Sequence, residues 1–321
     1  MEWKTRFYEQ YHEVDGFYLS KAFPVESVRS ALRYKAQLGD LFIVSYPKCG
    51  TTWMQHIVYN IINDHPPPKN LLLGCMEMPF LEMQGAESVE DMKKPGPIKT
   101  HMPFRLQPYS KDARYIYVTR NPYDCCVSYF YHTRDMPDYK FQDGTFDQFF
   151  EMFLEGRVDF GDYFDHLLSW YEHRGDSNVL FVTYEQLKKD VRTSVLKIAD
   201  FIGQKYGQKL RNDNSRLEKV LKNISVESMK KCVNESLKTS LNELEARLDG
   251  KVPKWLGLLK ESAGPETCEK PMSGDFVRKG IVGDWRNHFS EDQVKRLQSR
   301  IEEKTRGSDL LNLWNDTDIP H

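Results

Sequence analysis

The residues that could do chemistry lie in short segments far apart in the sequence. The first, residues 45–53, reads Ser-Tyr-Pro-Lys-Cys-Gly-Thr-Thr-Trp between a strand-like run and a helix-like run. A glycine turn at a helix N-terminus presents unpaired backbone N–H groups, and Lys48 adds a full charge beside them. The segment is not a Walker A loop, G-x-x-x-x-G-K-S/T, because Lys48 precedes Gly50. It predicts a loop that binds a nucleotide phosphate without the usual magnesium arrangement.

Two further segments add cations. Arg120 follows another strand-like run, and Ser128 lies in the first turns of the helix expected after it. The planar guanidinium of Arg120 matches a phosphate, and Ser128 offers a hydroxyl on the same side. Near the C-terminus, Arg278 and Lys279 precede Gly280, whose bare backbone can approach an anion closely. Alone, each segment is a weak signal, because a solvated or carboxylate-paired surface cation is commoner.

Alternating strand-like and helix-like runs predict the elements that position these segments. Apolar runs rich in β-branched and aromatic residues are each followed by a helical pattern, in the pairs 41–45 and 52–62, 115–119 and 123–131, and 179–183 and 186–201. The alternation predicts an α/β fold with a central parallel sheet flanked by helices, and the lack of polar alternation predicts strands buried on both faces. Ligands of such sheets bind beyond the carboxyl ends of the strands. The loops after Ser45, Thr119 and Thr183 should therefore converge on one site.

Two more helices are predicted in the C-terminal third. Within a charged segment at about 230–275, an amphipathic helix over 235–248 is indicated by leucines at helical spacing, namely Leu237, Leu241, Leu244 and Leu248. Ser290 and Gln293 have the spacing of a capping box, which predicts a final helix that runs to about Lys304.

Composition limits the class of protein. The chain has 321 residues, 40% of them hydrophobic, and carries 45 Lys+Arg against 47 Asp+Glu for a net charge of −2. It can bury a sizeable core, and near-neutrality removes the usual argument for nucleic acid while allowing a local basic pocket. The N-terminus lacks the apolar block of a signal peptide, and no run reaches the length of a membrane span. Six scattered cysteines indicate neither zinc nor a disulfide framework, so we expect a cytoplasmic protein with reduced thiols.

Together, the motifs resemble the cytosolic sulfotransferase family. The matching segments follow the family order along nearly the whole chain: Tyr-Pro-Lys-x-Gly-Thr-Thr-Trp at 46–53, Lys-Thr-His at 99–101, Arg-Asn-Pro at 120–122 with Ser128, and Arg-Lys-Gly through Gly-Asp-Trp at 278–285. The resemblance implies one sulfotransferase domain over 1–321, with a P-loop-like anion loop and a lid-like segment at about 230–275. It also implies a metal-independent enzyme that transfers the sulfuryl group of 3′-phosphoadenylyl sulfate (PAPS) to a small acceptor and leaves adenosine 3′,5′-bisphosphate (PAP).

The resemblance assigns roles at the donor site. The positions that it implies are Lys48, Cys49, Gly50, Thr51, Thr52, Trp53, Arg120, Ser128, Tyr184, Ser225, Val226, Met229, Arg278, Lys279 and Gly280. The first loop would hold the 5′-phosphate, Trp53 and Tyr184 would contact the adenine, and the segment 278–280 would hold the 3′-phosphate with Arg120 and Ser128. The family's Ser-Phe-x-x-Met is Ser-Val-Glu-Ser-Met here. Val226 replaces a ring, so stacking on that face of the adenine should be weaker.

The resemblance also implies the catalytic residues and the acceptor pocket. His101 matches the family's base, and an imidazole suits that task because its pKa lies near the working pH. Lys48 and Lys99 would contact the sulfuryl group. Acceptor contacts would come from Phe23, Phe80, Met83, Lys99, His101, Phe130 and His132, with Phe104 nearby. An acid at Asp135 or Asp138 could pair with an amine, so we expect a phenol or phenolic amine as the acceptor, with no nucleic acid or membrane partner.

Several points stay open at this stage. A P-loop kinase is disfavoured by the displaced Lys48 and the lack of a convincing magnesium-binding acid, and a non-catalytic nucleotide-binding module is disfavoured by the retention of both Lys48 and His101. The segment after Trp285 lacks the Thr-Val core of the family's dimerisation motif, so the oligomeric state is open. Cys49 lies where a helix N-terminus could lower the pKa of a thiol and allow oxidative control, although a buried inert thiol is the commoner case.

Overall fold

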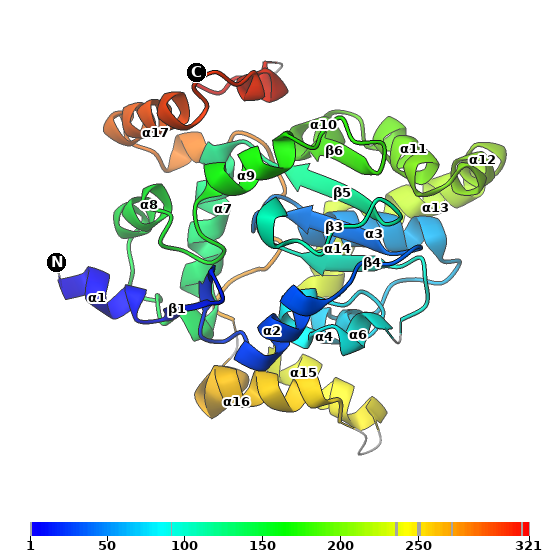
Figure 1. The fold of residues 1–321 in the computed structure, drawn as a ribbon, viewed down its shortest axis with the longest axis horizontal. Helices are drawn as coiled ribbons and strands as arrows, with labels where there is room; N and C mark the ends of the chain where they lie inside the picture. Colours follow the sequence, from blue (N-terminus) through cyan, green and yellow to red (C-terminus); the bar gives the residue numbers. More distant parts are fainter. Residues whose placement is uncertain are drawn as a thin grey trace.

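A four-stranded parallel sheet lies at the centre of the computed structural model (Figure 1), which describes residues 2–90, 92–234, 237–248, 252–270, 272–315 and 317–320. The strand order across the sheet is β4 (Pro97–Thr100), β3 (Leu41–Ser45), β5 (Arg114–Thr119) and β6 (Val179–Thr183). Because all neighbours pair in parallel, the carboxyl ends of the strands share one edge. The predicted α/β fold is confirmed.

A helix follows each of the three predicted strands, after a loop in the first two cases and directly in the third. These helices are α3 (Thr51–Ile62) after β3, α7 (Pro122–Asp135) after β5 and α10 (Tyr184–Lys189) after β6. The single helix predicted over 186–201 is wrong, because α10 ends before Asp190 and α11 (Val191–Ile202) begins after it. The Asp190 carboxylate accepts a hydrogen bond from the backbone N–H of Thr193 at 3.0 Å and so caps the second helix.

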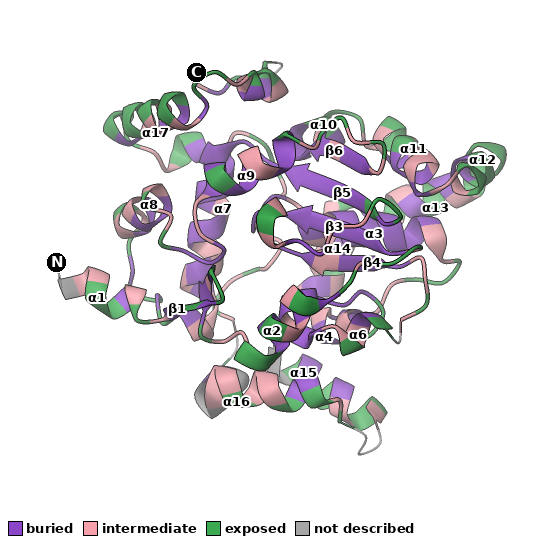
Figure 2. Ribbon diagram, viewed as in Figure 1, coloured by how far each residue is buried: buried purple, intermediate pink, exposed green. Residues whose placement is uncertain are grey.

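The sheet is buried on both faces (Figure 2), as its apolar strands predict. Leu41 and Ile43 of β3 pack into an aliphatic core with α3, α11, α12 (Gln204–Asn212) and α13 (Asn214–Asn223). Phe42 and Val44 point to the opposite face, because side chains alternate along a strand. There they pack into a larger aromatic core with α7, α8 (Phe146–Leu154) and α9 (Tyr163–Tyr171).

The lid-like segment forms two helices that lie together beside α4 (Leu71–Cys75; Figure 1). They are α15 (Leu237–Leu248) and α16 (Lys254–Glu269). Leu241 and Leu244 pack with α4 and α16 in a cluster separate from the two main cores. The predicted helix over 235–248 is therefore confirmed from residue 237, and residues 235 and 236 lie outside the described residues.

The remaining elements, within the described residues, are α1 (Glu2–Tyr8), β1 (Tyr11–Val14), β2 (Phe17–Ser20), α2 (Val25–Arg33), α4 (Leu71–Cys75), α5 (Leu81–Gln84), α6 (Glu87–Glu90), η1 (Phe104–Leu106), η2 (Pro137–Tyr139), α14 (Val226–Val233), η3 (Asp284–Asn287), α17 (Glu291–Lys304) and η4 (Leu310–Trp314). The capping box that predicts α17 is present, because Ser290 and Gln293 exchange side-chain to backbone hydrogen bonds. None of the helices in the described part of the chain has the length and apolarity that a membrane crossing requires.

Candidate active site

One cavity of about 370 Å³ lies at the carboxyl edge of the sheet, where the three predicted loops meet. Lys48, Arg120 and Tyr184, from the segments after β3, β5 and β6, all line it. His101, just after β4, lines it as well. The lid contributes residues from α15 and α16, so the cavity lies between the sheet and the lid.

The loop after β3 is shaped to bring backbone close to a ligand. Gly50 has φ of 107°, and a Cβ atom there would lie 3.0 Å from Cδ2 of Tyr184, so a glycine is needed on both counts. Gly50 is the N-cap of α3 and has no side chain that could cap the helix. The N–H groups of the first turn are therefore available to an anion beside Thr52, which lines the cavity.

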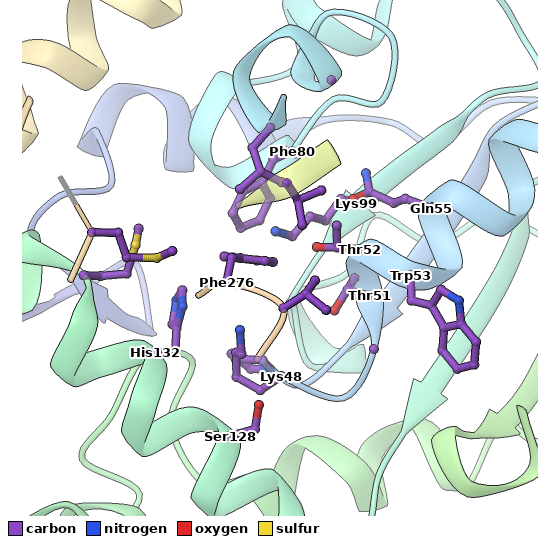
Figure 3. Close-up of a pocket in the computed structure, with 18 of the residues that line it drawn as sticks. Lys48, Thr51, Thr52, Trp53, Gln55, Phe80, Lys99, Ser128, His132 and Phe276 are labelled. Carbon is purple, nitrogen blue, oxygen red and sulfur yellow. The ribbon is translucent and has the colours of Figure 1, made fainter. Parts of the chain in front are cut away.

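Two lysines line this cavity close together (Figure 3). Lys48 lies in the loop after β3, and Lys99 lies in the neighbouring strand β4. Lys48 Nζ lies 4.1 Å from the centre of the Phe276 ring, and Lys99 Nζ lies 4.0 Å from the centre of the Phe80 ring. Among the described residues, neither ammonium group forms an ion pair with a carboxylate. Burial, followed by repulsion from Lys99 and Arg120, lowers the pKa of Lys48 to about 7, and burial also lowers the pKa of Lys99. Buried cations that form no ion pair within the described residues favour an anionic ligand here.

His101 lines the same cavity and is held at three points. Its Nδ1 lies 2.6 Å from the carbonyl oxygen of Ser45, and because a carbonyl can only accept, Nδ1 must carry the proton. The backbone N–H donates to Glu82 at 2.5 Å, and the carbonyl oxygen accepts from His166 Nε2 at 3.1 Å. Burial and the charge of Lys99 lower the pKa of His101 well below its usual value. The ring is therefore neutral, with Nε2 as its free acceptor.

A second group of cations that lines the cavity is held by carboxylates. Arg278 and Lys279 donate to the two oxygens of Asp284, at 2.5 Å and 2.7 Å. The Asp124 carboxylate of α7 accepts from the backbone of Gly283 at 2.7 Å and of Trp285 at 3.1 Å. This clamp brings the C-terminal basic segment to the cavity.

Arg120 joins this group from the loop after β5. It donates to the carbonyl oxygen of Ile281 at 2.9 Å, and its guanidinium lies 4.6 Å from the centre of the Tyr184 ring. Its Nε is buried without a partner. Ser128 lines the cavity from α7. The residues assigned to the 3′-phosphate from sequence therefore do lie together.

An aromatic slot lies beyond the first turn of α3. Trp53 and Tyr184 pack edge to face at 5.5 Å, and Trp53 Nε1 donates to the carbonyl oxygen of Ile224 at 2.8 Å. Val226 and Met229 line the cavity nearby. A Cβ at Gly280, which has φ of 66°, would lie 2.9 Å from Val226 Cγ2, so Val226 fills this face with methyl groups.

Three residues that the sequence assigned to the donor or acceptor site do not line the cavity. Ser225 is the N-cap of α14 and does not line the cavity. Cys49 is fully buried with its Sγ 3.7 Å from that of Cys125, and burial raises the pKa of its thiol, which is the inert arrangement rather than the activated one. Phe130 packs in the aromatic core with Phe141, Phe146 and Phe149.

Other residues that the sequence assigned to the acceptor pocket do line the cavity. Phe23, Phe80, Met83 and His132 line it, whereas Phe104 stacks on His173 with ring centres 3.4 Å apart. Of the two candidate acids, Asp135 is bound by Arg134 and by Ser273 of the lid segment and does not line the cavity. Asp138 does line it, and its buried Oδ1 has no hydrogen-bond partner in the part of the chain that the structure describes.

Two residues that complete the site, Glu82 and Phe160, were not predicted from the sequence. Glu82 is fully buried and also accepts from Thr100 Oγ1 at 2.9 Å, and burial raises the pKa of its carboxyl to about 7. The Phe160 ring lies 4.9 Å from that of His101. No local pattern marks either residue, because both act through contacts with distant segments. Within the described residues, no group of three or more His, Cys, Asp or Glu side chains is placed to hold a metal ion.

Comparisons with known proteins agree with this site. Residues 38–309 match the sulfotransferase domain family. Sulfotransferase 1C2 of Oryctolagus cuniculus is 33% identical over 308 residues, which cover 93% of each chain. Sulfotransferase 1E1 of Homo sapiens is 30% identical over 319 residues, which cover 95% of this chain and 96% of that protein.

Solved structures give the same result. The crystal structure of mouse sulfotransferase SULT7A1 complexed with PAP superposes with a TM-score of 0.68 at 28% identity and covers 94% of this chain and 96% of that chain. Retinol dehydratase in complex with androsterone and PAP shares the fold, with a TM-score of 0.71 at 20% identity over 95% of this chain and 94% of that chain. The chain therefore belongs to the sulfotransferase family and is a sulfotransferase enzyme.

Proposed function

We propose that this enzyme transfers the sulfuryl group of PAPS to the hydroxyl of a small aromatic acceptor, with His101 as the general base. The donor assignment is supported by the similar mouse structure, which is complexed with PAP, and by the two groups of cations that line this cavity. PAPS carries phosphates on the 3′ and 5′ carbons of its ribose and the sulfuryl group beyond the 5′-phosphate. Two groups of cations that line one cavity match these two centres of negative charge.

The observation that carries the proposal is the tautomer of His101. Its Nδ1 donates to the Ser45 carbonyl at 2.6 Å, so Nε2 is left to accept a proton. As the acceptor oxygen bonds to sulfur, its proton would pass to Nε2. The bond from sulfur to the bridging oxygen would break, and its electron pair would remain on the 5′-phosphate of PAP. Lys48 and Lys99 would stabilise the charge that develops there.

The test is sulfate transfer from labelled PAPS to a panel of phenols. We expect His101→Ala to lower kcat by about 10²- to 10⁴-fold while PAP still binds, because only proton removal is lost. His173→Ala is the matched control, since His173 packs on Phe104 away from the cavity. Transfer that persists in His101→Ala would contradict the role of His101. If ATP rather than PAPS serves as the donor, or neither donor reacts, the proposed reaction itself is wrong.

We further propose that the acceptor carries an amine, which Asp138 binds. The Asp138 carboxyl lines the cavity with Oδ1 unpartnered, and burial raises its pKa to about 6. At pH 7 the carboxylate would predominate, and an ammonium group would supply the partner that it lacks.

Tyramine and 4-ethylphenol test this point, because they differ by the ammonium group. We expect tyramine to be preferred, and Asp138→Asn to lower its kcat/KM about tenfold more than that of 4-ethylphenol. Asp135→Asn is the control, since Asp135 contacts the lid segment and not the cavity. Equal rates for the two phenols that Asp138→Asn leaves equal would exclude an amine site at Asp138.

A further inference from the structure

His132 places a second imidazole in the acceptor part of the cavity. It lies four residues after Ser128 on α7, so the two side chains share one face of the helix, and both line the cavity. The edge of its ring meets the Phe276 ring with centres 5.7 Å apart at 86° and the Tyr139 ring with centres 5.8 Å apart at 62°. The imidazole is therefore fixed between two aromatic rings of the cavity wall.

One polar atom of this ring, Nδ1 of His132, is buried, and no hydrogen-bond partner for it lies among the described residues. A neutral imidazole always has one nitrogen that donates and one that accepts, and leaving either unsatisfied in an apolar wall is unfavourable. Phenylalanine serves elsewhere in the wall, at Phe23, Phe80 and Phe160, without that penalty. The unpaired nitrogen is thus a polar contact available to a ligand.

The neighbours of His132 indicate which part of a bound ligand it would contact. Phe276, which it contacts, also carries the Lys48 ammonium group 4.1 Å from its ring centre (Figure 3). Burial and the charges of Lys48 and Lys99 lower the pKa of His132 well below its usual value. His132 is therefore a neutral hydrogen-bonding group at the reaction end of the cavity. A cationic group of the acceptor would be repelled there by the two lysines.

We propose that His132 is a specificity-determining residue that hydrogen-bonds a second hydroxyl of the acceptor, adjacent to the hydroxyl that reacts at His101. The substrate class is then the catechols, in which two hydroxyls lie on neighbouring ring carbons. A hydroxyl both donates and accepts, so it satisfies either tautomer of the imidazole. This inference rests on the proposed sulfuryl transfer to an aromatic hydroxyl, and it is separate from the ammonium contact proposed for Asp138.

The test compares catechol and phenol as acceptors for the wild type, His132→Phe and His132→Asn. In the wild type we expect the kcat/KM of catechol to exceed that of phenol by about 10- to 100-fold after correction for their acidities, because phenol leaves His132 unpaired. His132→Phe should reduce this ratio to about one, and His132→Asn should restore part of it. His173→Phe makes the same change of residue outside the cavity and should leave the ratio as in the wild type.

A second measurement separates this inference from the proposed reaction. Affinities of catechol and phenol for the complex of the protein with PAP are measured by calorimetry, which needs no turnover. The inference holds if His132→Phe abolishes the preference for catechol in this complex. It is wrong if the wild type binds the two acceptors equally, or if His132→Phe weakens both by the same factor. Sulfate transfer to phenol alone, without a catechol preference, would leave the proposed reaction intact and overturn the role of His132.

Discussion

The two groups of cations in the cavity are held in opposite ways. Arg278 and Lys279 share the buried carboxylate of Asp284, whose exposed fraction is 2%. Lys48 and Lys99 instead lie over the rings of Phe276 and Phe80 and, within the described residues, have no carboxylate partner. The first group is arranged before any ligand arrives. The second group keeps its charge unsatisfied.

This difference matches the two tasks of a group-transfer enzyme. The 3′-phosphate of the donor is equally charged before and during the reaction, so cations that bind it contribute affinity without accelerating the chemical step. Charge at the bridging oxygen grows only in the transition state. Cations without a counter-ion, in a desolvated site, respond most strongly to charge that develops there. The reaction-end lysines should therefore affect kcat, and the paired cations should affect binding.

The largest expected effect tests this division with one substitution in each group. Lys48→Met should lower kcat by about 10³-fold, because it removes a charge that acts on the leaving oxygen. Lys279→Met should instead raise the KM for PAPS about tenfold, with a smaller change in kcat, because its contact is the same in the ground and transition states. Steady-state kinetics with varied PAPS separate the two parameters. If both variants alter the same parameter by similar factors, the two groups do not differ in function.

The anion loop after β3 and the surroundings of His101 differ in how far they could be predicted from sequence. Lys48, Gly50 and Thr52 lie within one strand, loop and helix unit, so local pattern places them together. The contacts that hold His101 come from Ser45, 56 residues away, and Glu82, 19 residues away, and no local pattern encodes such distances. The same limitation explains why the lid segment could be recognised as a helix but not placed against α4.

Helix geometry explains why Phe130 does not line the cavity. Asp124, Ser128 and His132 are spaced by four residues on α7, and together they clamp the basic segment and line the cavity. Phe130 is two residues from Ser128 and therefore points to another side of the helix, into the aromatic core. Phasing the helix from Ser128 would have retained His132 and removed Phe130.

The second prediction concerns the counter-ion itself. Burial alone would raise the pKa of Asp284, but hydrogen bonds from Lys279 and Arg278 outweigh it and hold the pKa well below the usual range. Asp284→Asn leaves both cations without their partner, so the free energy of unfolding should fall by about 3 kcal/mol. Urea unfolding with and without PAP measures this. PAP should stabilise the variant more than the wild type, since its 3′-phosphate would replace the lost charge.

The pH dependence of unfolding provides the control for this prediction. Because the folded-state pKa of Asp284 is depressed, its contribution to stability is present above the pKa of the unfolded carboxyl, near 4, and is lost as the pH falls through the folded value. The difference between wild type and Asp284→Asn should therefore shrink on acidification below about pH 4. A variant as stable as the wild type at pH 7 would show that the carboxylate does not hold these cations together.

The smallest effect concerns the charge state of the reaction-end lysines in the free protein. Burial and the neighbouring cations lower the pKa of Lys48 to about 7, so part of the population is neutral at physiological pH. An anionic nucleotide binds the ammonium form, which means that binding takes up a proton above pH 7. The affinity for PAP should fall by up to about tenfold per pH unit between pH 7 and pH 9. The phosphates of PAP are already fully ionised in this range, because their second pKa lies near 6. Calorimetry in buffers of different ionisation enthalpy measures the proton uptake directly.

Two variants provide the controls. Lys48→Met should reduce the dependence of PAP affinity on pH and Lys279→Met should retain it, because only the first removes the partly neutral amine. An affinity that is constant from pH 7 to pH 9 would show that Lys48 is fully charged before the donor binds, and the two groups of cations would then differ only in their partners.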